Sequence, residues 1–334
     1  MRICLIGNYY LDKPLDEGMA KVGFCLWQEL SQRHDVLYLS VKSLFSPEFW
    51  KEIKNFNPQV VHYVPGASIK NLGLMRTVKY YCGKAKMIIS VQQMNFPGFT
   101  RLMVPLLTPD TVLVQSSQAE RMFGAAGCKT VFLPNGVDIE RFSPVSSEDK
   151  RKLRTKYRVK SDKTVLMHVG PLKKSRNIDL LIKMQQRGDN QVIAVASTSN
   201  PSEEAASEQL RQSGCIVWET YFENIEEVYG LSDYYIFPVT YKLGSIEIPL
   251  SVLEAMSCNL PVLATRYRAL PRLFSEGGGL YLTDGDAGSI PLLEKIKVDP
   301  EPVATRAKVL DLTWQKVTDR LEQIYGEVTG MTDE

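Results

Sequence analysis

The feature that most constrains the fold is an alternation that runs the whole length of the chain. Short runs rich in β-branched residues alternate with amphipathic stretches of helical period. This pattern is typical of βαβ units and parallel sheets. It is interrupted over residues 135–160, where turn residues and a basic run follow one another. We therefore predict an α/β protein of two doubly wound domains joined through this segment.

The expected elements follow from the same alternation. In the first half we expect strands at 2–7, 35–39, 59–63, 86–91, 111–114 and 129–133, and helices at 19–33, 68–82 and 117–126. In the second half we expect strands at 164–169, 191–196, 215–218, 234–238 and 261–264, and helices at 178–186, 203–212, 224–231 and 250–257. One helix closes the chain after Glu301 and includes Val309, Leu312 and Trp314. The expected N-terminal domain is 1–145 with a returning helix at about 312–334, and the C-terminal domain is 146–311.

Composition excludes several classes of protein. The chain has 334 residues, enough for two cores, with hydrophobic content of 44% and charged content of 23%, as in ordinary soluble proteins. Its net charge of +2 gives no reason to expect a nucleic-acid partner. No apolar run reaches the length of a membrane span, and the N-terminus enters a strand without a signal-peptide layout. We therefore expect a cytoplasmic protein.

Cysteine and histidine are poorly placed for metal or redox chemistry. The six cysteines are scattered without a Cys-x-x-Cys pair, and there are three histidines. A disulfide framework, a zinc site and a Ser-His-Asp triad are all disfavoured. We predict no metal and no resident cofactor.

The first informative motif is residues 245–262. It is expected to form a loop, a helix that begins near Pro249, an end at Asn259 and then a strand. A helix N-terminus at the mouth of a strand offers free N–H groups to a phosphate. Glu254, in the first turns of that helix, could accept hydrogen bonds from the hydroxyls of a ribose. Equally, Glu254 could only complement the helix dipole or pair with an arginine.

The second motif, residues 168–181, is a strand, a turn containing Gly170 and a helix. Lys173, Lys174 and Arg176 gather before that helix, where positive charge is unfavourable unless an anion binds. A bound diphosphate would remove the conflict. The alternative is a solvated turn whose lysines point to water.

A third motif, at residues 134–142, follows a strand end with a tight turn through Gly136. Together these motifs resemble family 4 of the retaining glycosyltransferases, the group 1 glycosyltransferases. Residues 134–138 with Phe142 resemble the interdomain signature of that family. Residues 169–182 resemble its phosphate-binding turn, and residues 232–262 its acidic donor-site motif. Residues 313–325 are similar to the helix that returns to the N-terminal domain.

The resemblance implies the GT-B fold, two facing Rossmann-like domains, and transfer of a sugar from a nucleotide-diphosphate sugar with retention of configuration. The acceptor would be a glycan, a lipid-linked sugar or a small molecule. The implied catalytic residues are Lys173, Lys174, Arg176 and Glu247. The implied donor-binding residues are Gly18, Gly170, Tyr221, Ile248, Pro249, Leu250, Ser251 and Glu254. The implied acceptor-side residues are Asn8, Gln92, Gln93 and Asn95.

This chain departs from the family pattern at three places. Pro171 stands where the family has an arginine, for which Lys173 or Lys174 could substitute. Glu247 comes one residue later than the first glutamate of the family's acidic pair. Glutamines stand where the N-terminal domain often has a histidine, and an amide cannot transfer a proton at neutral pH.

With no nucleophilic carboxylate evident, we expect front-face substitution, in which the departing diphosphate receives the proton of the acceptor. Two other interpretations stay open. One is a degenerate GT-B protein that binds a nucleotide sugar or a partner without turnover. The other is a nucleotide-sugar epimerase.

One helix of the first half carries a basic and partly aromatic surface: Lys70, Arg76, Lys79, Lys84 and Lys86, with Met75 and the pair Tyr80-Tyr81. It could be an ordinary solvated helix face. It could also meet anionic lipid, which would make the protein peripheral to the inner membrane face.

Overall fold

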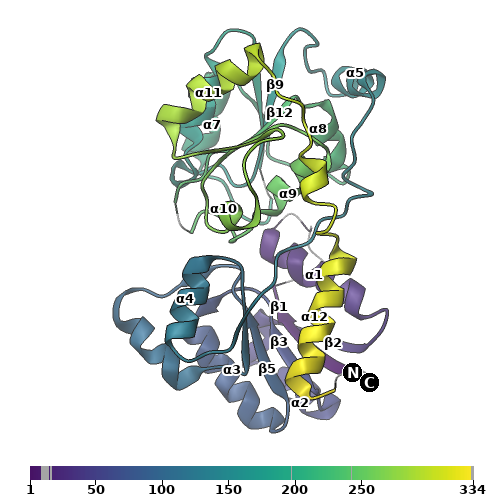
Figure 1. Ribbon diagram of the computed structural model, residues 1–334, viewed down its shortest axis with the longest axis vertical. Coiled ribbons are helices and arrows are strands. Elements are labelled where there is room, and N and C mark those ends of the chain that lie inside the picture. Colours follow the sequence, from purple (N-terminus) through teal and green to yellow (C-terminus); the bar gives the residue numbers. More distant parts are fainter. Residues whose placement is uncertain (9–14, 16, 197, 242, 332–334) are drawn as a thin grey trace. The chain divides into compact units, whose positions relative to one another are not determined.

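The computed structural model describes residues 1–8, 15, 17–196, 198–241 and 243–331. Contacts divide the chain into two units, each with its own sheet (Figure 1). Unit 1 comprises Met1–Gly136, Ser245–Ile248 and Trp314–Glu334, and unit 2 comprises Val137–Gly244 and Pro249–Thr313. The inclusion of Ser245–Ile248 in unit 1 has no counterpart in the domains expected from the sequence.

Unit 1 is built on a parallel sheet with the strand order β2-β1-β3-β5-β7-β8. The strands are β1 (Arg2–Gly7), β2 (Asp35–Ser40), β3 (Val60–Tyr63), β5 (Lys86–Ser90), β7 (Thr111–Val114) and β8 (Thr130–Phe132). A short second ladder pairs β4 (Ala67–Ser68) with β6 (Met94–Asn95). The strands are apolar on both sides because helices cover both faces of the sheet.

Different helices cover the two faces of this sheet. One core unites side chains of α2 (Pro47–Phe56), α3 (Ile69–Cys82), the 3-10 segment η2 (Gly98–Leu107) and α4 (Ser117–Ala125). On the other face α1 (Gly18–Leu30) packs against α12 (Trp314–Thr329). A 3-10 turn, η1 (Val41–Phe45), precedes α2.

The closing helix begins at Trp314, so the expectation that Val309 and Leu312 belong to it is wrong. A 3-10 helix at Arg306–Lys308 and a turn come before it, and the Val137 N–H donates to the Leu312 carbonyl while Val137 bridges Thr313. Gly136 is required by close packing rather than by its turn. A Cβ there would lie 2.6 Å from the Trp314 ring.

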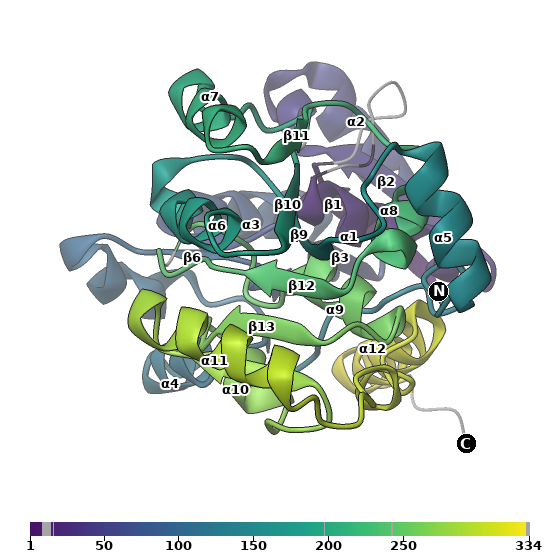
Figure 2. The same cartoon turned by 90° about the horizontal axis from the view of Figure 1, so that it is seen from above.

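Unit 2 has a parallel sheet with the strand order β11-β10-β9-β12-β13-β14. Its strands are β9 (Thr164–Val169), β10 (Asn190–Val195), β11 (Ile216–Trp218), β12 (Tyr234–Phe237), β13 (Val262–Thr265) and β14 (Leu280–Thr283). One core joins α6 (Ile178–Gln185), α7 (Glu204–Gln212) and α11 (Asp286–Val298). Figure 2 shows the strands β11, β10, β9, β12 and β13 of this sheet in succession. The remaining helical elements are α5 (Ser147–Lys156), η3 (Lys174–Arg176), α8 (Ile225–Leu231), α9 (Leu250–Ser257), α10 (Leu270–Leu273) and η4 (Arg306–Lys308).

Both sheets reverse their strand order once, between β1 and β3 in unit 1 and between β9 and β12 in unit 2. Ligands of open parallel sheets bind beyond the carboxyl ends of the strands at such a reversal. The candidate residues should therefore follow β9 and β12 in unit 2, and the strands near β1 and β3 in unit 1. Of the helices that the structure describes, none is long and apolar enough to cross a membrane.

Candidate functional site

The turn after β9 holds Arg176. Gly170 adopts a φ of +142°, a conformation that disfavours side chains. A Cβ on Gly170 would lie 2.5 Å from Nη2 of Arg176, so the glycine leaves room for the guanidinium. Nη1 of Arg176 donates to the Gly244 carbonyl. Gly170 and Arg176, both predicted from the sequence, are thus brought into direct contact.

Arg176 is a buried cation. The residue is 6% exposed, and burial lowers the pKa of its guanidinium. Among the residues that the structure describes, it forms no ion pair with a carboxylate, and its buried Nε has no hydrogen-bond partner. A buried charge is costly unless it is paired. The site is therefore suited to an anionic ligand, which a guanidinium can bind with paired hydrogen bonds.

The two lysines predicted beside Arg176 are placed differently. Nζ of Lys173 donates to Oδ1 of Asn200 at 3.2 Å. Lys174 is exposed, and its backbone N–H donates to Oε2 of Glu203 at 3.2 Å. Arg176 alone of the three is buried against the turn.

Glu254 lies on α9 and is also buried, at 7% exposure. Its Oε2 accepts a hydrogen bond of 2.8 Å from the hydroxyl of Tyr229, on α8. Burial raises the pKa of Tyr235, on β12, and of the two predicted charges Arg176 lowers that pKa while Glu254 raises it. The rings of Tyr229 and Tyr235 pack with centroids 5.8 Å apart and planes tilted by 31°. The sequence analysis missed both tyrosines.

The helix that carries Glu254 begins as predicted. Pro249 precedes its first residue, Leu250, and no side chain caps its N-terminus. Its end at Asn259 is also confirmed, since that residue adopts a φ of +55°. Pro249 and Leu250 are buried, whereas Ser251 is half-buried. The N–H groups of the first turn are the ones that the prediction assigned to a phosphate.

In unit 1 a buried amide cluster follows three strands. Gln92 follows β5, Gln115 follows β7 and Asn135 follows β8. Nε2 of Gln115 donates to Oδ1 of Asn135 at 2.8 Å and to Oε1 of Gln92 at 3.4 Å. All three residues are at most 3% exposed. Gln115 and Asn135 were not predicted to belong to a site.

Residues of this cluster hold the segment Ser245–Ile248. The backbone N–H of Glu247 donates to the main-chain carbonyl of Gln92 at 2.7 Å, and the side-chain Nδ2 of Asn135 donates to the Ile248 carbonyl at 3.0 Å. Nε2 of Gln93 donates to the Ser245 carbonyl at 3.2 Å. Glu247 is 1% exposed. The structure thus brings Glu247 and Ile248 to Gln92 and Gln93, two groups that the sequence had assigned to different halves of the reaction.

Gly18 is the first residue of α1, and the segment Ser245–Ile248 passes close to it. A Cβ on Gly18 would lie 3.3 Å from Cδ1 of Ile246. The carboxylate of Glu17 caps α1 by accepting from the N–H groups of Met19 and Ala20 at 3.1 and 2.7 Å. A phosphate at these N–H groups would have to displace Glu17, which the sequence analysis did not anticipate.

The other predicted site residues are less buried. Asn8 follows β1 and is half-buried, Asn95 is exposed on β6, and Tyr221 is 45% exposed in the loop after β11. Most of the loop between Asn8 and Gly18, at 9–14 and 16, lies outside the described residues.

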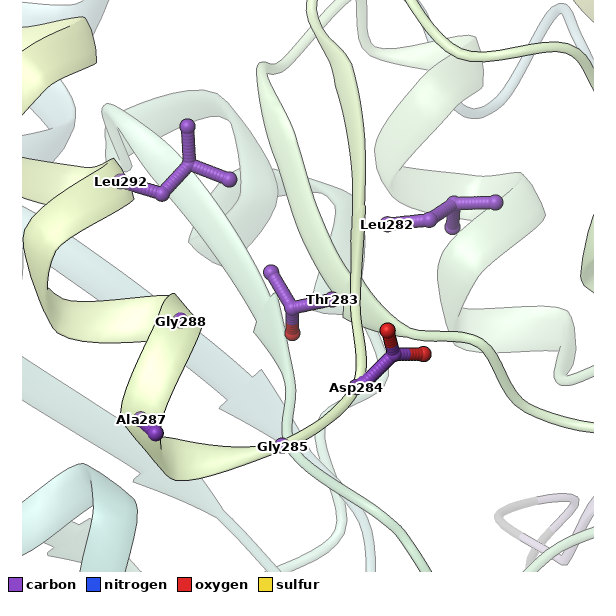
Figure 3. A pocket seen from close by; sticks show the side chains of 7 residues that line it. All are labelled: Leu282, Thr283, Asp284, Gly285, Ala287, Gly288 and Leu292. Atoms are coloured by element: carbon purple, nitrogen blue, oxygen red, sulfur yellow. The ribbon is translucent and has the colours of Figure 1, made fainter.

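A separate cavity of about 340 Å³ lies where β14 meets α11 (Figure 3). Asp284, Gly285 and Gly288 line it, and Asp286 starts the helix. The sequence analysis overlooked this Asp-x-Asp spacing. Asp286 accepts hydrogen bonds from Asn177 and Lys183 at 2.6 and 2.8 Å, so its carboxylate is already engaged. In the described part of the chain no three His, Cys, Asp or Glu residues form a metal-ligand group.

The sequence and the fold are similar to those of known proteins. Residues 163–295 match the family model of the glycosyl transferases group 1. This part of the chain resembles the group 1 glycosyltransferases. The segment contains Gly170, Arg176 and Glu254, so these three predicted site residues lie within the family match. The predicted family resemblance is confirmed.

Two relatives are glycosyltransferases with different named substrates. The chain is 26% identical over 278 residues to the GDP-mannose-dependent monoacylated alpha-(1-6)-phosphatidylinositol monomannoside mannosyltransferase of Corynebacterium glutamicum, over 76% of this chain and 73% of that protein. It is 22% identical to the sulfoquinovosyl transferase SQD2 of Arabidopsis thaliana, over 69% of this chain and 47% of that protein. The match thus spans about half of the second relative.

Solved structures confirm the predicted GT-B fold with two Rossmann-like domains. HepE of Anabaena, solved in complex with UDP, superposes with a TM-score of 0.76 at 15% identity, over 98% of this chain and 100% of that one. Sucrose-phosphate synthase of Thermosynechococcus elongatus superposes with a TM-score of 0.80 at 15% identity, over 99% of this chain and 100% of that one.

Proposed function

We propose that the protein is a retaining glycosyltransferase that takes its sugar from a nucleotide-diphosphate donor. The observation that carries this proposal is the buried Arg176, which no carboxylate of the described residues neutralises and which lies against the turn at Gly170. A diphosphate supplies the missing negative charge. The UDP complex of HepE and the GDP-mannose dependence of the corynebacterial relative support a donor of this class.

In the proposed binding mode, unit 2 takes the donor. Arg176 and the N-terminal N–H groups of α9 bind the diphosphate. Glu254 accepts hydrogen bonds from the ribose hydroxyls, and the Tyr229 hydroxyl fixes the orientation of that carboxylate. Lys173 contributes a second positive charge. No metal is assigned to the site, and no resident cofactor.

The proposed reaction is a front-face substitution. A bond forms between an acceptor hydroxyl oxygen and the anomeric carbon while the bond from that carbon to the β-phosphate oxygen breaks on the same face. The proton of the acceptor passes to the leaving diphosphate. Arg176 stabilises the negative charge that develops on this leaving group, which is where an enzyme gains most from a fixed cation. The side chains of Gln92, Gln93, Asn8 and Asn95 are amides, so they can orient an acceptor but cannot take its proton.

The test is incubation of the protein with UDP-, GDP- and ADP-sugars, with and without simple glycoside acceptors. We expect release of the nucleoside diphosphate with one donor, and thermal stabilisation by the matching free nucleotide. The anomeric coupling constant of the product, measured by proton NMR, tests retention. An inverted product would contradict the mechanism but not the donor class.

Each alternative predicts a different readout in the same experiment. Stabilisation by a nucleotide without any turnover would indicate a binding protein, and conversion of the donor sugar into its epimer would indicate an epimerase. A protein that no nucleotide stabilises would overturn the proposed function altogether.

A further inference from the structure

A long stretch of unit 1 contains no acidic residue. Between Glu52 and Asp110 the sequence has no Asp or Glu but has seven Lys or Arg residues. Since Asp and Glu together number 38 in 334 residues, such a gap is unusual for a soluble surface. The stretch includes α3 and η2, which pack against each other on one face of the sheet. We call the surface that these two elements present the acid-free face, because neither element contributes a carboxylate to it.

Both elements already bury apolar side chains in the core of unit 1. Met75 and Val78 of α3 and Val104 of η2 are at most 2% exposed in the core of unit 1. The burial of Met75 corrects the expectation that it belongs to the surface of the helix. Apolar side chains that remain on the outside of these elements are thus in excess of what folding requires.

The exposed apolar surface of α3 and η2 is large. Tyr80 is 87% exposed, Leu102 is 80% exposed and Leu106 is 74% exposed. Tyr81 and Met103 are also exposed, at 50% and 42%. Single exposed apolar residues are ordinary, but a cluster on adjacent elements marks an interaction surface.

Basic residues border these apolar side chains. Arg76 and Lys84 are exposed beside the tyrosines of α3, and Arg101 is exposed beside Leu102. None of the three forms an ion pair with any residue that the structure describes. By contrast, Lys79 is neutralised by Asp110, with Nζ 2.7 Å from its Oδ2. The acid-free face therefore presents uncompensated positive charge together with apolar and aromatic groups.

We propose that the acid-free face docks on an anionic lipid bilayer. Leucine and tyrosine side chains enter the boundary between headgroups and acyl chains, and the cations meet anionic headgroups. Neither element contributes a carboxylate, and Asp110 beside α3 is neutralised by Lys79, so the remaining cations complement a negatively charged bilayer. The inference stands apart from the proposed donor chemistry, because it uses no residue of the donor site.

The test is sedimentation of the full chain with sucrose-loaded vesicles of phosphatidylcholine, with or without about 30 mol% phosphatidylglycerol. We expect binding only to the anionic vesicles. The variant Leu102→Ser with Leu106→Ser should bind at least about tenfold more weakly. Val298→Ser removes an equally exposed apolar side chain from unit 2, at 86% exposure, and should bind as the wild type does.

A variant without three of the cations measures the electrostatic contribution to vesicle binding. Arg76→Gln with Lys84→Gln and Arg101→Gln should weaken binding about a hundredfold, at about fivefold for each cation. Its matched control changes three exposed cations of unit 2, Arg151, Lys160 and Arg187, to Gln and should bind normally. Thermal unfolding of every variant, followed by circular dichroism without nucleotide, verifies that the chain is folded.

Three results would overturn the proposal. The first is an absence of vesicle binding. The second is equal binding to neutral and anionic vesicles. The third is a serine variant whose sedimentation coefficient falls in the absence of lipid, because a second copy of the chain would then cover the face.

Discussion

Replacement of Arg176 by methionine separates stability from ligand binding more sharply than any other single change. In the free protein the guanidinium is buried, its pKa is lowered by that burial, and no carboxylate of the described residues compensates its charge. Desolvation of such an ion costs several kcal/mol, of which one charge-assisted hydrogen bond, here to the Gly244 carbonyl, returns about 1.5–3 kcal/mol. Methionine has similar length and no charge.

We therefore expect Arg176→Met to leave the free energy of unfolding unchanged or to raise it by about 1–2 kcal/mol. Binding of the nucleoside diphosphate should change in the opposite direction. The loss of one charge-assisted contact of about 1.5–3 kcal/mol corresponds to an affinity about 10- to 150-fold lower. Turnover should fall further, by about a hundredfold or more, because the charge on the leaving group grows in the transition state.

The assay is thermal unfolding of wild type and variant, alone and in a titration with UDP, GDP and ADP. Arg187→Met is the matched control, since Arg187 is an exposed arginine of the same unit. A methionine variant that unfolds more easily yet binds nucleotide as the wild type does would refute the reasoning. Arg176 would then be a structural residue.

Three further predictions concern buried contacts. Tyr229→Phe removes the hydrogen bond to Glu254, so donor affinity should fall about tenfold in a nucleotide titration while the fold is retained, and unchanged affinity would show that Glu254 does not depend on it. Asn135→Asp replaces the amide donor to Ile248 by a carboxylate, so urea unfolding should show a loss of about 1–3 kcal/mol. Burial lowers the pKa of His62 to about 3, so its contribution to stability is complete above pH 6.5 and declines as the pH falls towards 3. Between pH 7.5 and 5 the wild type should lose about 2 kcal/mol more than His62→Gln, and equal losses would contradict this assignment.

Most strands of the two sheets were predictable because they depend on local pattern, although β14 (Leu280–Thr283) was missed. A run such as residues 164–169 is apolar and β-branched, and the structure forms β9 over that range. Elements with a broken pattern were missed. In α11 the helical period is interrupted by Gly288 and Pro291, and in η2 by Pro105. Packing against the core supplies what the local sequence of these elements does not.

The candidate site was predictable only where a motif fixes the backbone. Gly170 and Arg176 come from one turn, and their contact follows from its short length. The bond between Tyr229 and Glu254 joins two helices, and that between Asn135 and Ile248 joins residues far apart in sequence. Such contacts depend on the direction of each side chain in the folded state, which a pattern of hydrophobic and polar residues does not encode.

The position of the segment Ser245–Ile248 gives the buried amide cluster a structural role. Glu247 departs from the family pattern by one residue, and a displaced carboxylate in a mobile loop would be of little use in a reaction. Here the N–H of Glu247 donates to the main-chain carbonyl of Gln92, and the side-chain amide of Asn135 donates to the Ile248 carbonyl, so the segment is fixed on both sides of the carboxylate. The following peptide bond leads into Pro249 and the N-terminus of α9. Loss of the Asn135 amide should therefore displace two neighbouring parts of the chain. These are Glu247 itself and the start of the helix that carries Glu254.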